Sequence, residues 1–388
     1  MESRSLLVTG VSGYIGGAVL SAILKTKDPW AKDLKISALV RTEAQAAKIR
    51  GLGVTPELCS SFDELDKLEN IGEQIDIIIH AGSGWHTPSA KALIKGQGTR
   101  RQKTGNRVHY IQISGTSNLS DRPYTEGYID NHVFSDEEDI FSYEKYRESR
   151  EVYFQRTTDI AVVEDGEAFG VTTYIIMAPT IFGLGSGPFN RFSMQLPMLI
   201  TDALQTGGCS VVSSGDTIYN HVHIEDLAAL YLILLRNICA NITIPSGRKG
   251  IYFCESGEHS HFEFSERLAQ AGHELEVFSS SEVSKITIQE AGEKWLFGNA
   301  AGAELGFASK FVPSITLPLS MTVFADIRCH LISSRIKAVL ARKLGWAPSY
   351  AGEWENTFRT ELTEFITNPP ARREIPKIPE KIEPEGSR

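Results

Sequence analysis

The sequence predicts an α/β fold of the Rossmann type, which is a doubly wound parallel sheet, with a smaller C-terminal substrate-binding portion. Three observations predict it. Short apolar runs alternate with helical patterns from the N-terminus, a glycine-rich segment follows the first run, and the alternation weakens beyond residue 183. The chain of 388 residues is long enough for two to three domains of ordinary size.

Six segments have the length and composition of buried parallel strands. They are rich in β-branched residues or leucine, and helical patterns separate them as in βαβ units. The six are Ser5–Thr9, Leu34–Val40, Gly53–Leu58, Ile75–His80, Val108–Ile113 and Val171–Met177. Between the first two, Ile15, Val19, Ala22 and Ile23 recur at three- and four-residue spacing, which predicts a helix with its apolar face on the sheet.

We expect three regions along the chain. Residues 1–183 would form the dinucleotide-binding domain, including the sixth strand at 171–177, and residues 184–366 the substrate-binding portion, from which some segments return to the sheet. Residues 367–388 hold five prolines among charged side chains, which predicts a disordered tail. The charge-poor segment within 299–330 fits a loop or an insertion, and the sequence does not indicate its role.

The charge of the chain excludes some partners. It carries 39 Lys and Arg against 48 Asp and Glu, a formal net charge of −9, which repels nucleic acids and anionic membranes.

The longest apolar run, Leu227 to Leu235, has nine residues, against the ~20 that a membrane-spanning helix needs. Five cysteines stand far apart, without a Cys-x-x-Cys pair, so no metal site is predicted. We expect a cytoplasmic protein.

The segment TGVSGYIG at residues 9–16 has the glycine spacing of a dinucleotide-binding loop. The cofactor-binding residues predicted in it are Gly10, Ser12, Gly13, Tyr14, Ile15 and Gly16. Gly10 would permit the tight turn, Gly13 would let the backbone approach a diphosphate, and Gly16 would let helix and strand pack closely. Free N–H groups at the helix start would then face the diphosphate. The alternative is a tight turn that binds nothing.

The second predicted strand is followed by Arg41 and Thr42, where NAD-selective proteins usually carry an acidic residue. A guanidinium can instead pair with a 2′-phosphate, because it offers a planar fork of donors. Arg41 and Thr42 are therefore predicted to bind NADP, with NAD possible. The alternative is a solvated arginine at the end of a strand.

These segments resemble the atypical and extended short-chain dehydrogenase/reductases of the NAD-dependent epimerase/dehydratase family. The sequences of several segments resemble the fungal members most. Six motifs carry the resemblance, from about residue 5 to residue 350: TGVSGYIG at 9–16, HAG at 80–82, SGT at 114–116, APTIFG at 178–183, HVHIEDLA at 221–228 and KLGWAP at 343–348. The resemblance implies that Ala81 and Gly82 lie beside the adenosine ribose and diphosphate, and Pro179 and Thr180 beside the nicotinamide.

The resemblance also implies a catalytic Ser or Thr, a Tyr and a Lys four residues after the Tyr. Ser114 and Thr116 occupy the first position, and the register favours Thr116. Tyr153, 26 residues before Pro179, fits the Tyr best, but Thr157 stands where the Lys would be. A phenol needs a nearby cation to exchange its proton at neutral pH, and the neighbouring Arg156 could supply one. The alternative is a helix that has lost the catalytic pair.

Two classes of function remain open. The first is an NADP(H)-binding oxidoreductase or epimerase/dehydratase that acts on a small-molecule carbonyl or alcohol, for which the resemblance implies fungal secondary metabolism. The second is a non-redox isomerase or lyase, or a dinucleotide-sensing protein, that kept the fold but lost the Tyr/Lys pair. In either class we expect a small-molecule ligand, no nucleic acid, no membrane, and a monomer or homodimer.

Overall fold

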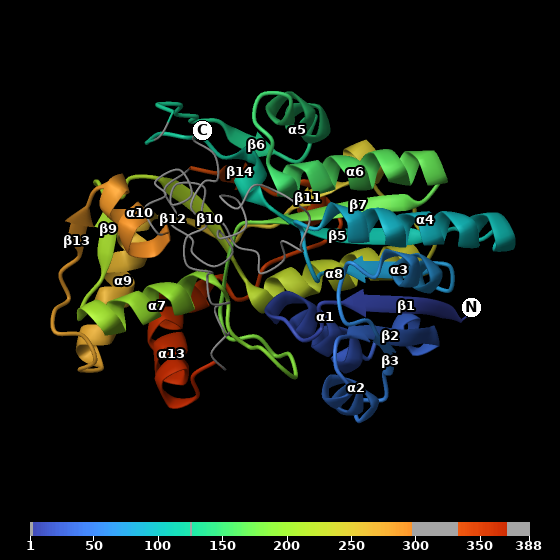
Figure 1. Cartoon of the computed structure of the whole chain (residues 1–388), viewed down its shortest axis with the longest axis horizontal. Coiled ribbons are helices and arrows are strands. Elements are labelled where there is room, and N and C mark those ends of the chain that lie inside the picture. The colour runs from blue at the N-terminus through green and yellow to red at the C-terminus, as the bar shows by residue number, and fades with distance from the viewer. Residues whose placement is uncertain (1–2, 125, 297–332, 371–388) are drawn as a thin grey trace, which may run out of the picture.

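The computed structural model describes residues 3–124, 126–296 and 333–370. Its centre is a seven-stranded sheet in the order β11-β7-β5-β4-β1-β2-β3, with every neighbouring pair parallel (Figure 1). The strands are β1 (Arg4–Thr9), β2 (Leu34–Val40), β3 (Thr55–Leu58), β4 (Ile77–His80), β5 (His109–Gly115), β7 (Thr172–Ala178) and β11 (Ile251–Phe253). The predicted doubly wound parallel sheet is confirmed.

All six predicted strands are present, and the seventh, β11, comes from later in the chain. It pairs Ile251 with Ile175 of β7 at the edge of the sheet. Strand β11 is only three residues long, too short to show a pattern in the sequence. A segment beyond residue 183 thus returns to the sheet.

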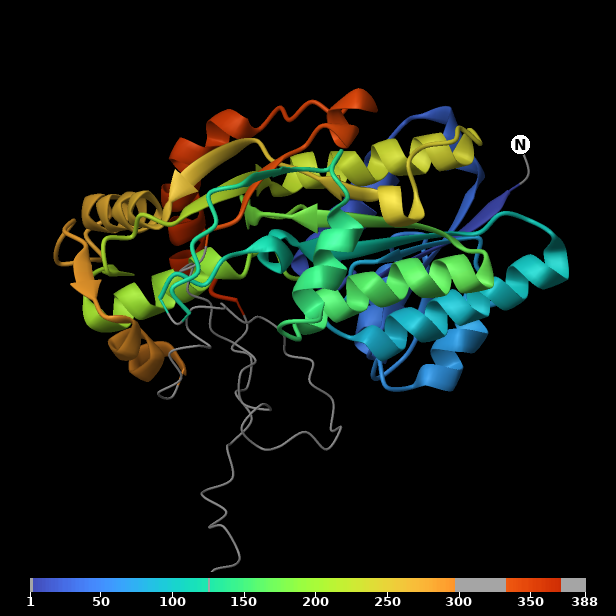
Figure 2. The same cartoon turned by 90° about the horizontal axis from the view of Figure 1, so that it is seen from above.

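Helices cover both faces of the sheet (Figure 2). On one face α1 (Tyr14–Lys25) packs against α8 (Ile224–Cys239), and on the other α4 (Thr87–Thr104) lies between α3 (Leu65–Gly72) and α6 (Phe154–Phe169). Helix α2 (Glu43–Arg50) follows β2. The predicted apolar face of α1 is confirmed in Val19 and Ile23, which are buried.

The remaining described elements form a smaller portion beyond the carboxyl ends of the strands, with small sheets β12-β10-β8, β13-β9 and β14-β6 (Figure 1). Its helices are α5 (Ile140–Glu148), α7 (Gln195–Thr206), α9 (His261–Glu274), α10 (Ile288–Leu296), α12 (Leu340–Lys343) and α13 (Trp354–Thr367). Its strands are β6 (Val133–Ser135), β8 (Thr180–Phe182), β9 (Ser210–Val212), β10 (Ile218–His223), β12 (Gly257–Ser260), β13 (Ser284–Ile286) and β14 (Arg335–Lys337). Trp354, Phe264 and Phe358 of this smaller portion share a second apolar core. The segment 299–330 and residues 371–388 of the predicted tail lie outside the described residues.

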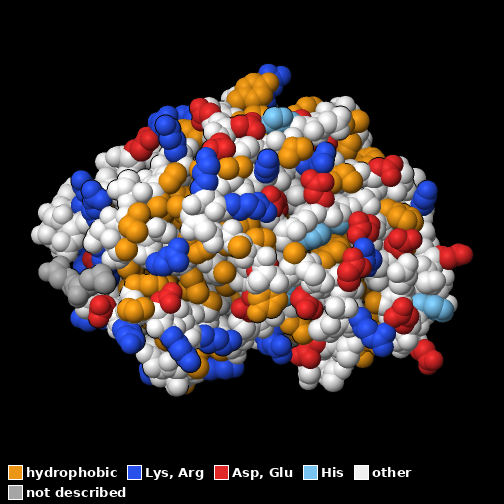
Figure 3. Space-filling model, turned by 180° about the vertical axis from the view of Figure 1, so that it is seen from behind, with side chains coloured by type: hydrophobic (Ala, Val, Ile, Leu, Met, Phe, Trp, Pro, Cys, Tyr) orange, Lys and Arg blue, Asp and Glu red, His pale blue; other side chains and the backbone are white. Residues whose placement is uncertain are grey.

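The face seen in Figure 3 carries both basic and acidic side chains, with the acidic ones concentrated towards the right of the view. Among the described helices, none combines the length and the apolar character required to cross a membrane.

Asp226, in the first turn of α8, ties the C-terminal segment to the dinucleotide-binding sheet. Its carboxylate is buried and accepts hydrogen bonds from the backbone N–H groups of Ser349, at 2.7 Å, and Tyr350, at 3.0 Å. The indole N–H of Trp346 donates to the backbone carbonyl of Asp226 at 2.8 Å. The HVHIEDLA and KLGWAP motifs therefore form one structural joint.

Replacing Asp226 by alanine should lower the free energy of unfolding by ~2–4 kcal/mol, because two partly buried N–H donors lose a charged and buried acceptor. Asp226→Asn keeps an acceptor oxygen and should lose clearly less. Chemical denaturation of the three proteins measures the difference. A loss below ~0.5 kcal/mol in the alanine variant would contradict this account of the joint.

Candidate active site

The glycine loop between β1 and α1 needs its glycines. Gly10 has φ +73°, and a Cβ there would lie 2.6 Å from the carbonyl oxygen of Ala81. A Cβ at Gly16 would lie 2.5 Å from the carbonyl oxygen of Gly10. Gly13 is the N-cap of α1, and no side chain caps this end of the helix. The positive end of α1 is therefore available to an anionic ligand.

The other predicted residues of this loop face the segment that follows β8. The Tyr14 hydroxyl donates to the carbonyl of Gly183 at 2.5 Å, and burial raises the pKa of Tyr14. The carbonyl of Ser12 accepts from the N–H of Asn190 at 3.4 Å, and Ile15 packs on the central core. Segment 183–190 thus contacts the start of α1 from outside the sheet.

Arg41 and Thr42 stand at the carboxyl end of β2. The Arg41 side chain is exposed and makes no ion pair with any described residue. The Thr42 hydroxyl accepts the N–H of Gln45 at 3.2 Å and so caps α2. The guanidinium of Arg41 is therefore free for a ligand, whereas the Thr42 hydroxyl already has a structural role.

The end of β4 is held close to the glycine loop by Thr9. The Thr9 hydroxyl lies 2.9 Å from Nδ1 of His80 and accepts the N–H of Gly82 at 3.1 Å. Burial, with a smaller effect of His86, lowers the pKa of His80 to about 3, so this imidazole is neutral. Ala81 and Gly82 consequently lie beside the glycine loop, and their contact with the adenosine ribose and diphosphate stays a prediction.

The sequence analysis missed Phe62 in this region. A Cβ at Gly82 would lie 2.4 Å from the tip of the Phe62 ring, so the glycine leaves room for this ring. Phe62 stands four residues after β3. The position just beyond a parallel strand was the available signal, because such positions gather at the ligand-binding edge of the sheet.

The carboxyl ends of β5 and β7 bring together Thr116, Pro179 and Thr180. Gly115 pairs with Ala178, so the residues that follow each strand are neighbours. Thr116 and Thr180 are both buried, and the Thr180 hydroxyl has no hydrogen-bond partner among the described residues. A buried hydroxyl without a partner fits a site that a polar ligand completes.

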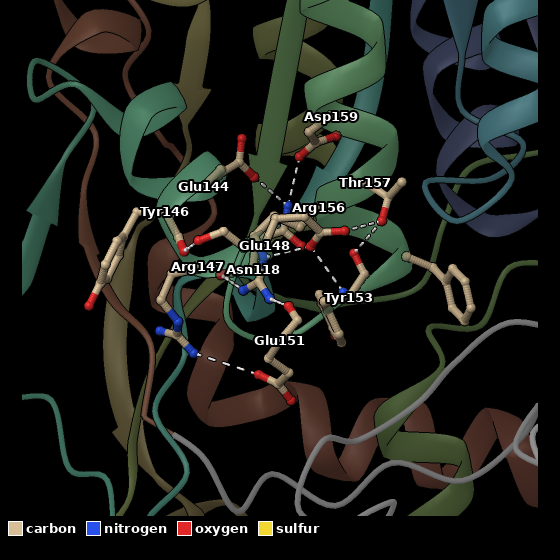
Figure 4. Close-up of polar contacts among 12 residues, drawn as sticks. Asn118, Glu144, Tyr146, Arg147, Glu148, Glu151, Tyr153, Arg156, Thr157 and Asp159 are labelled. Atoms are coloured by element: carbon tan, nitrogen blue, oxygen red, sulfur yellow. Dashed lines mark hydrogen bonds and ion pairs between the residues drawn. The ribbon is translucent and has the colours of Figure 1, made fainter.

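The start of α6 is organised by one carboxylate, that of Glu148 (Figure 4). It accepts the N–H of Tyr153 at 3.0 Å, the Nε–H of Arg156 at 3.1 Å, and the hydroxyl of Thr157. Thr157 is the residue that the resemblance would align with lysine. Its hydroxyl is bound to this acid.

Arg156 is fully buried and fixed by the backbone around it. It donates to the carbonyl of Asn118 at 2.8 Å and to that of Glu151 at 2.7 Å. Its guanidinium lies over the ring of Tyr153, 5.4 Å from the centroid, and the Tyr153 ring also meets Trp85 edge to face at 4.9 Å. A positive charge is thus placed beside the predicted tyrosine, against its ring.

Ser114 points away from Thr116, into a buried polar cluster under α6. Its hydroxyl donates to Asp159, and the Asn118 amide donates to both Asp159 and Glu144 at 2.7 Å (Figure 4). Burial raises the pKa of Asp159 to about 8, and burial together with the Asp159 charge raises the pKa of Glu144. At neutral pH this cluster holds protons that two exposed carboxyl groups would release.

The raised pKa of Asp159 makes stability depend on pH. The folded protein keeps this proton up to about pH 8, whereas an unfolded chain releases it near the ordinary value of 3.8. The resulting stabilisation is complete below pH ~4 and is lost as the pH rises towards about 8, with a slope of at most ~1.4 kcal/mol per pH unit for one proton.

Asp159→Asn should therefore flatten the fall in unfolding free energy between pH 5 and pH 8, since its amide cannot titrate. Asp165→Asn, on the same helix and ion-paired with Lys91 at 3.3 Å, is the matched control and should keep the wild-type slope. Denaturant unfolding at several pH values supplies the comparison. Identical slopes in wild type and Asp159→Asn would show that the cluster does not retain the proton.

With this geometry described, the relationships of the chain can be stated. Residues 126–243 match the NAD dependent epimerase/dehydratase family. The match covers 118 of the 388 residues of the chain. The resemblance predicted from the motifs is confirmed, and with it an enzyme of the NAD(P)-dependent, extended short-chain type.

Individual relatives are distant. The oxidase ucsJ of an Acremonium species is 22% identical over 302 residues, which are 74% of this chain and 84% of that protein. The dTDP-glucose 4,6-dehydratase DesIV of Streptomyces venezuelae, solved with NAD, shares the fold with a TM-score of 0.60 and 13% identity, over 94% of this chain and 97% of that one. A UDP-N-acetylglucosamine 4-epimerase of Methanobrevibacter ruminantium has a TM-score of 0.54 and 12% identity, over 95% and 99%.

Proposed function

We propose that this protein uses NADP(H) to oxidise an alcohol or reduce a carbonyl group of a small molecule. The observation that carries the proposal is a continuous path along the carboxyl ends of the strands. It runs from the glycine loop past Ala81 and Gly82, which lie so close to Gly10 that a Cβ there would be 2.6 Å from both, to Thr116 and Thr180 after the paired ends of β5 and β7. This is the edge where open parallel sheets bind their ligands.

The residues along this path suit a dinucleotide. The uncapped start of α1 offers N–H groups to a diphosphate, and the exposed guanidinium of Arg41 offers donors to a 2′-phosphate. At the other end, the buried Thr180 hydroxyl lacks a partner among the described residues. When bound, the nicotinamide supplies or accepts a hydride. That hydride must be matched by a proton on the substrate oxygen.

We assign that proton to Tyr153 and the holding of the oxygen to Thr116. Tyr153 is the N-cap of α6 and fits the tyrosine position that the resemblance implies, and Arg156 places a cation over its ring. Thr116 begins the turn after β5 and can donate its hydroxyl to a developing oxyanion. Ser114 would act indirectly, because its hydroxyl is bound to the carboxylate of Asp159.

The names of the relatives are consistent with the proposed class of reaction. The Acremonium relative is named an oxidase, the Streptomyces structure holds NAD, and the Methanobrevibacter epimerase is in complex with UDP-N-acetylmuramic acid. We propose a small-molecule substrate in fungal secondary metabolism, acted on in the cytoplasm by a monomer or homodimer.

A second candidate is a non-redox isomerase or lyase, or a dinucleotide-sensing protein. The observation that favours it is the hydrogen bond from Thr157 to Glu148, which fills the position of the family's lysine with an uncharged group. The substitutions at positions 153 and 116 described below decide between the two candidates.

Preference for NADP(H) is expected to depend on Arg41. Arg41→Ala should weaken NADPH binding by roughly tenfold or more, since a charged hydrogen bond to a phosphate is worth ~1.5–3 kcal/mol, and should leave NADH binding nearly unchanged. Arg50→Ala, which removes an arginine already paired with Glu43, is the control. Calorimetric titration of both cofactors measures the effect. Tighter binding of NADH than NADPH by the wild type would overturn the preference.

Tyr153→Phe should lower turnover by ~10²–10⁴-fold with little change in cofactor affinity, because it removes the proton relay alone. Thr116→Ala should act in the same direction. Tyr146→Phe, on α5 with 55% of its surface exposed, is the control and should be silent. Absorbance of the nicotinamide band, with a panel of carbonyl and alcohol substrates, measures turnover. Wild-type rates in Tyr153→Phe would reject this mechanism in favour of the non-redox candidate.

A further inference from the structure

The side chain of Gln155 occupies the crevice between the loops that follow β4 and β5. A Cβ at Gly84 would lie 3.1 Å from its Nε2 atom, and a Cβ at Gly115 would lie 3.1 Å from its Oε1 atom. Gly84 stands four residues beyond the end of β4, and Gly115 is the last residue of β5. Two glycines therefore leave room for one carboxamide at the ligand-binding edge of the sheet.

The neighbours of Gln155 at the start of α6 are engaged elsewhere. The Arg156 guanidinium donates to backbone carbonyls of Asn118 and Glu151, and the Thr157 hydroxyl to Glu148. The Tyr153 ring packs against Trp85. Of these residues, Gln155 is the one whose polar group contacts the backbone after both strands.

In the Gln155 amide, Oε1 already accepts a hydrogen bond, whereas Nε2 has donors that no described residue uses. Its Oε1 accepts the hydroxyl of Ser117 at 3.0 Å, which fixes the orientation of the amide. Its Nε2 makes no hydrogen bond with the described residues and is not among the atoms sealed from solvent, although the residue as a whole is buried. An amide nitrogen carries two donors, so this side chain is ready to bind an acceptor oxygen.

The position of that oxygen follows from the path of a dinucleotide along the sheet. Its diphosphate would lie at the glycine loop, beside Ala81 and Gly82, and the chain leads from there within two residues to Gly84 and the Gln155 amide. The half of the cofactor beyond the diphosphate is the nicotinamide ribose. Its hydroxyl groups are uncharged acceptors.

We propose that Gln155 donates its carboxamide N–H to the nicotinamide ribose of the bound dinucleotide, in the role that a lysine ammonium cannot fill in this chain. Ser117 is the positioning residue that orients the amide. This inference rests on the proposed use of a dinucleotide. Gln155 would thus bind the cofactor through hydrogen bonds without contributing a positive charge.

The test compares two ligands that share the adenosine half. NADPH contains the nicotinamide ribose, whereas 2′,5′-ADP does not. Gln155→Leu should weaken NADPH binding by ~3–10-fold, the equivalent of one neutral hydrogen bond, and change the affinity for 2′,5′-ADP by less than twofold. Gln102→Leu, at an exposed position of α4, should change neither. Calorimetry gives the four dissociation constants.

Two further variants test the proposed role of the Gln155 amide. Ser117→Ala should lower NADPH affinity by a smaller factor in the same selective way, and Gln155→Glu, which has no donor, should be at least as weak as Gln155→Leu. Equal losses for both ligands, or unchanged NADPH affinity in Gln155→Leu, would overturn the assignment of Gln155 alone. Failure of the wild type to bind either ligand would overturn the proposed function itself.

Discussion

The close approach of two backbones governs this molecule. Gly10 turns with a positive φ so that the glycine loop touches the carbonyl of Ala81, and Thr9 fixes the same segment through Gly82 and His80. The loop after β1 and the loop after β4 are thereby held together at the point where the order of the sheet reverses. Everything that acts on a ligand here is placed relative to that contact, because the segment 81–84 leads from it to the end of β5.

The second organising centre is the Glu148 carboxylate, which gathers the backbone of Tyr153 and the side chains of Arg156 and Thr157 at the start of α6. A lysine in this place would provide charge and donors in a single side chain. This protein divides these properties, since Arg156 holds the charge against the tyrosine ring while Gln155 holds free donors near the strand ends. The charge and the free donors at the start of α6 thus belong to two different side chains.

Much of the fold could be predicted from the sequence because its signals are local. The apolar runs of β1 to β5 and β7 and the glycine loop are each complete within a few residues. Strand β11 escaped prediction because three residues show no period, and Phe62 because its partner, Gly82, lies 20 residues away along the chain. The Glu144–Asp159 cluster and the role of Gln155 depend on how α5 and α6 meet β5, which no local pattern records. Ser114 was predicted at the same catalytic position as Thr116, and its hydrogen bond to Asp159 depends on the packing of α6 against β5, which no local pattern records.

The hydrogen bond from Thr157 to Glu148 determines what a lysine substitution at position 157 would do. A lysine introduced at position 157 would meet a carboxylate that already accepts three donors at the start of the helix. Its ammonium would pair with that acid and compete with the Arg156 guanidinium for it. A lysine placed at position 157 without a change at Glu148 would therefore be held by the acid and would not stand free beside Tyr153.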